Sequence, residues 1–493
     1  MAQNSLCRYT APYRASSGPI RVSTVNENRT SWKNDPETGM LEATWPREID
    51  MEAARKLAVA HLPADTYSDA TIEPFAKGGF HVLFLISSAT DPAAPKYLMR
   101  IPLPVDPFFK TESEVATMEY VRKHTTFPVP QVVAYASSAS NELGYEWILM
   151  EKMPGVSVSE FWDETMPFDA KKRLAIDIAG HMKTLLQLRF PLLGNLYFSD
   201  IWPQVNHTPV TWQKHDPDRK LSDPDDNLGL DPAFVVGRMV SPSFYSDKRL
   251  LLQAHRGPYG TARDLVVARI DLLGQRIRRL TPKPGTEYYC HLDESLAEGG
   301  PEVLEAFDEL RQVAPRIFGD AEGPEDAKVL WHNDLSANNV LVNPDTFALT
   351  GVIDWESAGI CSAWDTDQAM PYFLKGIELF QEPPPCGSLT EEEEENLTAI
   401  RQDWDQQVLR GIYAEALGDV LFDNSLHSKD EVNLKKTVGG LVEMFDDRWE
   451  SVIYWLNNEI DREKKVTRRL SRAAKTMTQT KVVKPAKSLR GWS

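Results

Sequence analysis

The residues best suited to chemistry lie in one short segment, His332 to Val342, with the sequence HNDLSANNVLV. This segment holds a histidine, an aspartate and two asparagines, and it runs directly into the apolar Val340 to Val342. Polar residues that only face water need no such grouping, whereas a loop that delivers an acid and an amide to one point ahead of a buried strand is typical of a functional site. We therefore interpret the segment as a site loop followed by a strand.

A second acid follows at a distance that suits a hairpin. The residues Asn343-Pro344-Asp345 predict a turn, and Leu349 to Ile353 predict a strand that ends at Asp354. Asp334, Asn339 and Asp354 would then meet at one end of a pair of strands. Their oxygens could bind a hard cation. Mg²⁺ suits so sparse a set better than calcium or zinc, because it takes few protein ligands and is completed by water and phosphate.

The stretch HNDLSANN followed by IDW resembles the catalytic loop and metal motif of the protein-kinase-like fold, in the form found in aminoglycoside phosphotransferases. The likeness covers roughly residues 49 to 380 and is greatest to a fungal group of phosphotransferase-family proteins. The stretches FPLLGNLYF and HRGPYG resemble an insertion of that group. The resemblance implies an α+β, bilobal fold with a small β-rich lobe and a larger, mostly helical lobe that contains an insertion.

The resemblance also implies roles for the residues of the loop. Asp334 matches the catalytic aspartate that orients a substrate hydroxyl and accepts its proton, and His332 matches the residue that braces the loop. Asn339 and Asp354 match the magnesium ligands. These residue types suit phosphoryl transfer, which depends on aligning the nucleophile while cations neutralise the phosphate oxygens.

Two residues of the first lobe match the phosphate-binding pair of the family. Arg100, in YLMRIP, stands where the family usually has a lysine, and Glu114 matches the helix glutamate that pairs with it. A guanidinium can hold two phosphate oxygens, but it is longer than an ammonium and differently hydrated. The substitution is therefore a departure from the family pattern.

The resemblance places two further nucleotide contacts. Gly78 and Gly79, in FAKGGFHVLFLI, resemble the loop that covers the nucleotide, where backbone N–H groups can approach phosphate because side chains are absent. The segment from Glu151 to Met153, in WILMEKMPG, falls where the hinge between the lobes would offer backbone groups to adenine. Together these matches predict ATP as the bound nucleotide.

Apolar periodicity predicts the elements that position these residues. In the first lobe the predicted helices cover residues 49–62 and 111–124, and the predicted strands cover 72–86 with a break at the two glycines, 97–102, 132–135 and 146–151. A long helix that carries Leu174 to Leu186 opens the second lobe. Two more amphipathic helices are predicted after the site, over residues 397–416 and 441–456.

These patterns divide the chain into four parts. They are a loose N-terminal arm at 1–48, a nucleotide-covering lobe at 49–153, a helical lobe with the catalytic loop at 154–460 and a basic tail at 461–493. An insertion near 196–325 is rich in Asp, Pro and Gly, and one helix is predicted within it, near 261–280. The arm shows no apolar periodicity, so it is expected to contribute little to a core.

Composition excludes some classes of protein. The 493 residues are 42% hydrophobic and 26% charged, and no apolar run approaches the roughly 18 residues that predict a membrane span. The net charge of −18 disfavours nucleic acid as a partner and favours a cationic small molecule as substrate. The tail after Glu463 carries ten basic residues and no acid, and we interpret it as a solvated end.

Four widely spaced cysteines, Cys7, Cys290, Cys361 and Cys386, indicate neither a zinc site nor a disulfide framework, so a cytoplasmic location is the default. Residues 1–26 contain three arginines, several serines and no acid, which is the composition of a transit peptide. Mitochondrial import is therefore the alternative.

The sequence as a whole predicts an enzyme that transfers the terminal phosphate of ATP to a hydroxyl of a small molecule. A protein kinase is disfavoured because Asp354 is followed by Trp-Glu and not by Phe-Gly, and because no Ala-Pro-Glu lies downstream. Arg100 and the long insertion motivate the alternative, a nucleotide-binding pseudokinase that is weakly active or inactive and acts as a regulator or scaffold.

Overall fold

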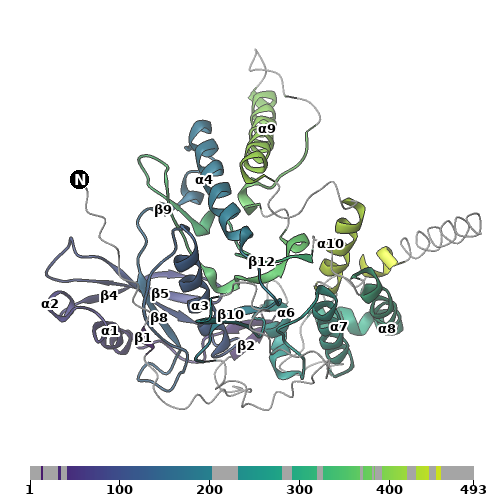
Figure 1. The fold of residues 1–493 in the computed structure, drawn as a ribbon, viewed down its shortest axis with the longest axis horizontal. Helices are drawn as coiled ribbons and strands as arrows, with labels where there is room; N and C mark the ends of the chain where they lie inside the picture. Colours follow the sequence, from purple (N-terminus) through teal and green to yellow (C-terminus); the bar gives the residue numbers. More distant parts are fainter. Residues whose placement is uncertain are drawn as a thin grey trace, which may run out of the picture.

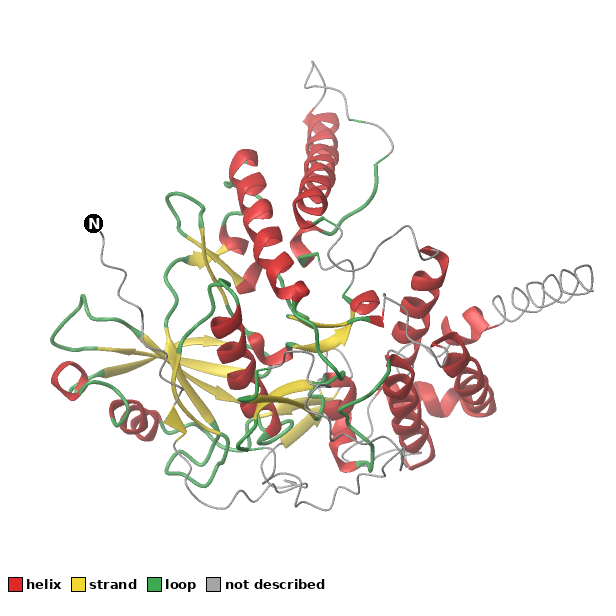
Figure 2. Cartoon of the chain, viewed as in Figure 1, coloured by secondary structure: helices red, strands yellow, loops and turns green. Residues whose placement is uncertain are grey.

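The structure is a computed structural model, shown in Figures 1 and 2. It describes residues 13–14, 31–34, 41–201, 231–279, 291–318, 326–366, 370–379, 382, 391–418, 429–443 and 451–456. Most of the charged stretch HDPDRKLSDPDDNLGLDP and the whole basic tail at 461–493 lie outside the described residues.

A six-stranded sheet in the order β1-β7-β8-β6-β5-β4 forms the centre of the small lobe. Its strands are β1 (Tyr13–Arg14), β4 (Thr71–Lys77), β5 (His81–Ser87), β6 (Tyr97–Pro102), β7 (Val132–Ala136) and β8 (Trp147–Glu151). Neighbours from β4 to β7 are antiparallel, and β1 joins β7 in parallel at the edge. The strands predicted from β-branched and apolar runs are therefore present, including the turn at Gly78-Gly79.

Both faces of this sheet are covered, which explains why its central strands are apolar at nearly every position. Leu85 and Leu98 face helix α3 (Phe109–His124) in one core. Their neighbours Phe84 and Met99 face the short helices α1 (Met51–Val59) and α2 (Ala64–Tyr67) in another. The alternation of side chains along each strand separates the two sets.

The prediction that residues 1–48 form a loose arm is wrong for the described part of that segment. Tyr13 and Arg14 add strand β1 to the sheet, and β2 (Ser31–Asn34) pairs with β3 (Leu41–Thr44). Trp45 packs edge-to-face on Tyr145 at 5.4 Å. The segment lacked periodicity because strands of two to four residues are held by backbone hydrogen bonds to a neighbour and leave little pattern in the side chains.

The second lobe is mostly helical (Figures 1 and 2). Helix α4 (Phe168–Gln187) packs against α9 (Glu391–Leu417) and the site strands, whereas α7 (Ala262–Arg279), α8 (His291–Phe318) and α10 (Lys429–Glu443) share a separate core. Within the part of the chain that is described, no helix is both long and apolar enough to cross a membrane. The β-rich lobe and the helical lobe together confirm the predicted α+β fold class.

Two predictions for the helices need correction. The insertion contains α8 as well as the one predicted helix, α7. Glycine and proline, here Gly300 and Pro301, usually break a helix. The chain nevertheless stays helical on both sides of a kink at Gly300, where φ is 45°. The helix predicted over 441–456 differs from the described helices in its bounds. Helix α10 starts earlier, at Lys429, and ends at Glu443, and helix is present again at 451–456.

The remaining strands lie around the predicted site. They are β9 (Val156–Ser157), β10 (Asn195–Phe198), β11 (Phe234–Gly237), β12 (Lys328–Trp331), β13 (Val340–Val342), β14 (Leu349–Val352) and β15 (Gly359–Ser362). The hairpin of β13 and β14 is the predicted one, with Val340 opposite Val352. The insertion contributes the antiparallel pair of β10 and β11 and the short helix α6 (Pro242–Tyr245).

Candidate functional site

The loop between β12 and β13 is held together by its own polar side chains. Asn339 donates from Nδ2 to both the backbone oxygen and Oδ2 of Asp334, each at 2.9 Å. His332 is fully buried, and its Nε2 lies 3.0 Å from the backbone oxygen of Ile353 while its Nδ1 accepts the Asp334 N–H at 3.3 Å. Burial lowers the pKa of His332, so the neutral ring donates from Nε2 and connects the loop to Ile353, directly after β14.

Asp354 is delivered to the same place by the β13–β14 hairpin. The N–H of Ile353 donates to the oxygen of Asn339 at 2.9 Å, so Asp354 follows directly after the residue that contacts Asn339 and His332. Asp354 has φ 64° and ψ 62°, a left-handed conformation that residues other than glycine seldom adopt. Such strain is concentrated at functional sites, where the surrounding structure maintains it.

Arg100 on β6 connects this loop to α3. Its side chain is 2% exposed, and its Nε lies 3.0 Å from Oε1 of Glu114. One terminal nitrogen, Nη2, lies 2.7 Å from Oδ1 of Asp354 and 2.5 Å from Oε2 of Glu356. Burial opposes the guanidinium charge, but the three carboxylates outweigh it and raise the pKa of Arg100. Three predicted site residues, from β6, α3 and the turn after β14, therefore form one buried cluster.

Two further groups join the cluster through Glu356. The ammonium of Lys110, on the first turn of α3, lies 2.5 Å from Oε2 of Glu356. Nδ1 of His81 lies 3.5 Å from the same oxygen. Burial opposes the ionisation of Glu356, but Lys110 and Arg100 hold its pKa well below the ordinary value. Burial and the charge of Arg100 lower the pKa of His81, so this ring is neutral.

Lys110, Glu356 and His81 were not among the residues predicted from the sequence. Two of them left a signal that could have been used. Lys110 precedes Glu114 by four positions, which places both on one side of a helix, and Glu356 follows Asp354 by two positions. For His81 the only signal in the sequence was its position just after the glycine turn.

The predicted nucleotide-covering loop lies between β4 and β5. The N–H of Gly78 donates to the oxygen of His81 at 2.9 Å, and a Cβ on Gly78 would lie 2.9 Å from the His81 ring. Phe80, at the tip, packs edge-to-face on Tyr245 of α6 at 5.9 Å. Burial, followed by the charge of Glu356, raises the pKa of Tyr245. The insertion therefore contacts the glycine loop beside the cluster, which nothing in the sequence indicated.

The predicted hinge residues lie where the small-lobe sheet ends. Glu151 is the last residue of β8, and its N–H donates to the oxygen of Gln131 at 2.9 Å. Met153 is buried beside Gly351 of β14, where a Cβ would lie 3.0 Å from the Met153 methyl carbon. The chain then enters β9, which pairs with β13. Glu151 and Met153 thus join the small-lobe sheet to the strands that carry the loop.

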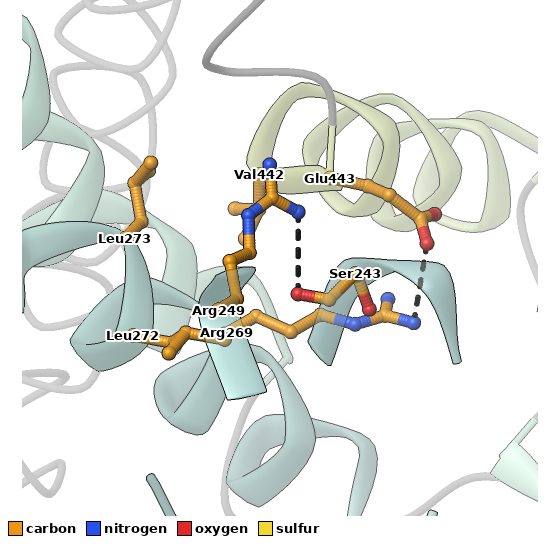
Figure 3. A pocket seen from close by; sticks show the side chains of 7 residues that line it. All are labelled: Ser243, Arg249, Arg269, Leu272, Leu273, Val442 and Glu443. Atoms are coloured by element: carbon orange, nitrogen blue, oxygen red, sulfur yellow. Dashed lines mark hydrogen bonds and ion pairs between the residues drawn. The ribbon is translucent and has the colours of Figure 1, made fainter. Parts of the chain in front are cut away.

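A small pocket elsewhere contains none of the predicted site residues (Figure 3). It is lined by residues of α7, of α10 and of the segment from α6 to Arg249, and Arg269 lies 3.5 Å from Glu443 across it. Its water-accessible space is about 20 Å³, roughly the room for one water molecule. We do not assign the candidate site to this pocket.

Comparison with known families agrees with this geometry. The model of the phosphotransferase enzyme family matches residues 71–232 and 250–363, which together make up more than half of the chain. The chain belongs to the phosphotransferase enzyme family, and this confirms the resemblance seen in its loop motifs.

Among curated relatives, the chain is 27% identical over 321 residues to a subtelomeric hrmA-associated cluster protein of Aspergillus fumigatus. It is 29% identical over 287 residues to the altered inheritance of mitochondria protein 9, mitochondrial, of Debaryomyces hansenii. The matches cover 59% and 53% of this chain, and 58% and 43% of those relatives. The chain therefore spans about half the length of the relatives it matches.

Solved structures that the chain matches include the streptomycin–ATP–APH(2″)-IIa ternary complex, at 12% identity and a TM-score of 0.37. That match covers 84% of this chain and 97% of the other. A choline kinase from Cryptosporidium parvum Iowa II is 15% identical with a TM-score of 0.35, and the match covers 85% of this chain and 97% of the other.

Proposed function

We propose that this protein transfers the terminal phosphate of ATP to a hydroxyl group of a small molecule. The observation that carries the proposal is the buried cluster in which Arg100 joins Glu114 to Asp354, next to a loop where Asn339 holds Asp334. In this arrangement Arg100 would bind phosphate and Asp354 would bind a metal ion. The carboxylate of Asp334, in the neighbouring loop, would act on the acceptor. The acidic body favours a cationic acceptor.

Asp334 orients the acceptor hydroxyl and accepts its proton as the new bond to phosphorus forms. Its position is fixed by the two bonds from Asn339 and by the bond from its own N–H to His332. A carboxylate held in one orientation aligns the nucleophile without first losing side-chain freedom. His332 contacts Asp334, Ile353 and the ring of Trp355, all of them parts of the protein, so we give it a positioning role.

The residues around Asp354 suit a magnesium ion. Oxygens of Asp354 and Glu356 and a ring nitrogen of His81 lie within 4.8 Å of one another. Carboxylate oxygens are the ligands that Mg²⁺ prefers, and we propose that Asp354 and Asn339 hold it. When bound, the ion supplies neutralisation of charge on the phosphate oxygens.

The nucleotide would lie between the two lobes. We propose residues 49–153 as the nucleotide-covering lobe and residues 154–460 as the lobe that carries the catalytic loop. Backbone groups of Gly78 and Gly79 would contact phosphate, and those of Glu151 and Met153 would contact adenine. Arg100 and its partner Glu114 would hold the phosphates in place.

Variants of the two aspartates test this assignment. Asp354→Asn should weaken magnesium-dependent binding of ATP and abolish turnover, because it removes the negative charge of a metal ligand. Asp334→Asn should bind ATP with magnesium nearly as the wild type does, and it should lose about 10² to 10⁴ in rate, the usual effect of removing a positioned general base. Calorimetric titration with ATP and magnesium, together with the rate of ATP hydrolysis by water, measures both.

The same experiment can refute the roles. If Asp334→Asn hydrolyses ATP and phosphorylates an acceptor as fast as the wild type, then Asp334 is not the base. A screen of polar and cationic small molecules for magnesium-dependent consumption of ATP, with Asp334→Asn as the control, would identify the acceptor.

One observation supports a second candidate function, that of a nucleotide-binding pseudokinase acting as a regulator or scaffold. Arg100 is engaged by three carboxylates at once, so its charge is already balanced before a phosphate arrives. The two candidates differ in turnover. Binding of ATP with no consumption across the acceptor screen would favour the regulator.

We propose a cytoplasmic location, with mitochondria as the alternative. The relatives named altered inheritance of mitochondria protein 9 carry the word mitochondrial in their names, which supports the alternative. Residues 1–40 fused to a fluorescent reporter decide between them, since a diffuse signal counts against import.

A further inference from the structure

Lys110 is a buried cation that the proposed mechanism does not use. It lies one turn before Glu114 on α3, its side chain is 3% exposed, and its ammonium contacts Oε2 of Glu356 at 2.5 Å. Burial of a lysine is costly unless a carboxylate pairs with it closely, and Glu356 does so. Glu356 is also one of the groups that could hold a metal ion, as a ligand in addition to the proposed Asp354 and Asn339.

The two cations at the cluster are held differently. Arg100 contacts carboxylates through both Nε and Nη2, and these contacts come from two lobes of the molecule. Lys110 has a compact ammonium on a flexible stem and contacts Glu356 alone among the three carboxylates of the cluster. Lys110 can therefore change partner by rotating its side chain, whereas Arg100 must break several contacts.

The charges of the cluster oppose binding of a metal ion alone. Glu114, Asp354 and Glu356 are balanced in part by Arg100 and Lys110. The two carboxylates that a divalent cation would bind, those of Asp354 and Glu356, are the ones that contact these two cations. A dication there would lie next to an ammonium and a guanidinium, and the repulsion is strong in a buried, weakly screened site.

A nucleotide would remove this conflict, because its phosphates bring several negative charges to the same place. The ammonium of Lys110 could leave Glu356 for a phosphate oxygen, and the carboxylate would then be free for the metal ion. Binding of the nucleotide would therefore favour binding of the metal ion, and binding of the metal ion would favour binding of the nucleotide.

We propose that Lys110 is an internal counter-ion of Glu356 that blocks the metal site until phosphate is present, and that it then becomes a second phosphate-binding cation. This inference rests on the proposed nucleotide site. It makes metal and nucleotide binding cooperative, and the cooperativity must be equal in both directions. In this role Lys110 controls the access of the metal ion to Glu356 and is a binding residue for the nucleotide.

The test is a calorimetric titration of the full chain with Mn²⁺ alone, and then with ADP in the presence of Mn²⁺. Lys110→Met should bind Mn²⁺ alone about tenfold more tightly than the wild type and should bind ADP with Mn²⁺ about tenfold more weakly, within the usual range of coupling. Lys123→Met is the matched control, because Lys123 lies on the same helix and pairs with Asp231. It should match the wild type in both titrations.

If Lys110→Met binds Mn²⁺ alone no more tightly than the wild type does, the inference is wrong. This arm needs no nucleotide, so it decides the role of Lys110 as a counter-ion even if ADP fails to bind and the proposed function falls. If Lys110→Met does not fold, Glu356→Gln provides the second test. It should bind ADP in the presence of chelator about tenfold more tightly, because Lys110 is released, and unchanged or weaker binding would overturn the inference.

Discussion

Glu119 lies in the middle of α3 and is 2% exposed, because this helix is covered by the sheet on one side and by the second lobe on the other. Its nearest cationic partner, Arg122, is 4.0 Å away. Burial raises the pKa of Glu119 to about 7, and Arg122 opposes the shift only in part. The folded protein therefore holds a proton here that the unfolded chain releases at lower pH.

This proton makes stability depend on pH. Because the folded-state pKa is higher than the unfolded value of 4.5, the free energy of unfolding should fall as pH rises from about 4.5 to about 7. Glu119→Gln should remove this contribution and stabilise the protein at pH 8 by about 1 to 3 kcal/mol relative to the wild type. An amide oxygen can still accept the backbone hydrogen bond from Val132.

Urea denaturation at pH 5 and pH 8 measures the difference. Glu73→Gln is the control, since Glu73 is exposed on β4 and its replacement should change stability little at either pH. Equal effects of Glu119→Gln at the two pH values would contradict the prediction.

At the scale of elements, helix α10 is attached to the strand that leads into the catalytic loop. Nζ of Lys435 lies 3.1 and 2.9 Å from the two carboxylate oxygens of Asp326, just before β12, and both side chains are 3% exposed. The C-terminal helical core is thereby joined to the segment that carries His332 and Asp334. Removing one member of a buried ion pair is costly because the remaining charge stays in a medium that solvates it poorly.

Lys435→Met should lower the free energy of unfolding by about 3 to 5 kcal/mol. The double variant Asp326→Leu, Lys435→Met should lose less than the sum of the single variants, because it leaves no charge behind. Urea denaturation of the four proteins forms the cycle, and Lys436→Met, at the next and half-buried position, is the control. Additive losses would show that the two residues do not act as a pair.

At the scale of the whole molecule, a nucleotide between the lobes should stabilise the fold. Arg100 connects the small lobe to Asp354, so a ligand that binds this cluster contacts both lobes at once. ATP with magnesium at 100 times its dissociation constant should add about 2.7 kcal/mol to the free energy of unfolding. The melting temperature should then rise by about a few degrees.

A thermal-shift measurement with ATP and magnesium, and with ATP and excess chelator, tests this expectation. The shift should be much smaller with chelator and in Asp354→Asn. A melting temperature that responds to neither nucleotide nor magnesium would refute the nucleotide site.

The sequence alone was sufficient for features that depend on local spacing. The pattern His332, Asp334, Asn339 and then Asp354 after a strand predicted the loop and hairpin, because the register of adjacent strands follows from the lengths of the strands and the turn. The alternation of apolar residues predicted the small-lobe strands, because side chains on a strand face opposite sides in turn. These local signals were also enough to recognise the family.

Only the tertiary structure determined which distant residues meet. Lys110 and Glu356 are 246 positions apart, and no local rule relates them. The contact between Phe80 and Tyr245 depends on how the insertion folds back onto the glycine turn. The strand at Tyr13–Arg14 was missed because a sheet edge supplies its hydrogen-bond partners, and α8 was missed because neighbouring helices stabilise a segment that glycine and proline would break in isolation. Packing and charge pairing act through space, and the one-dimensional pattern does not record them.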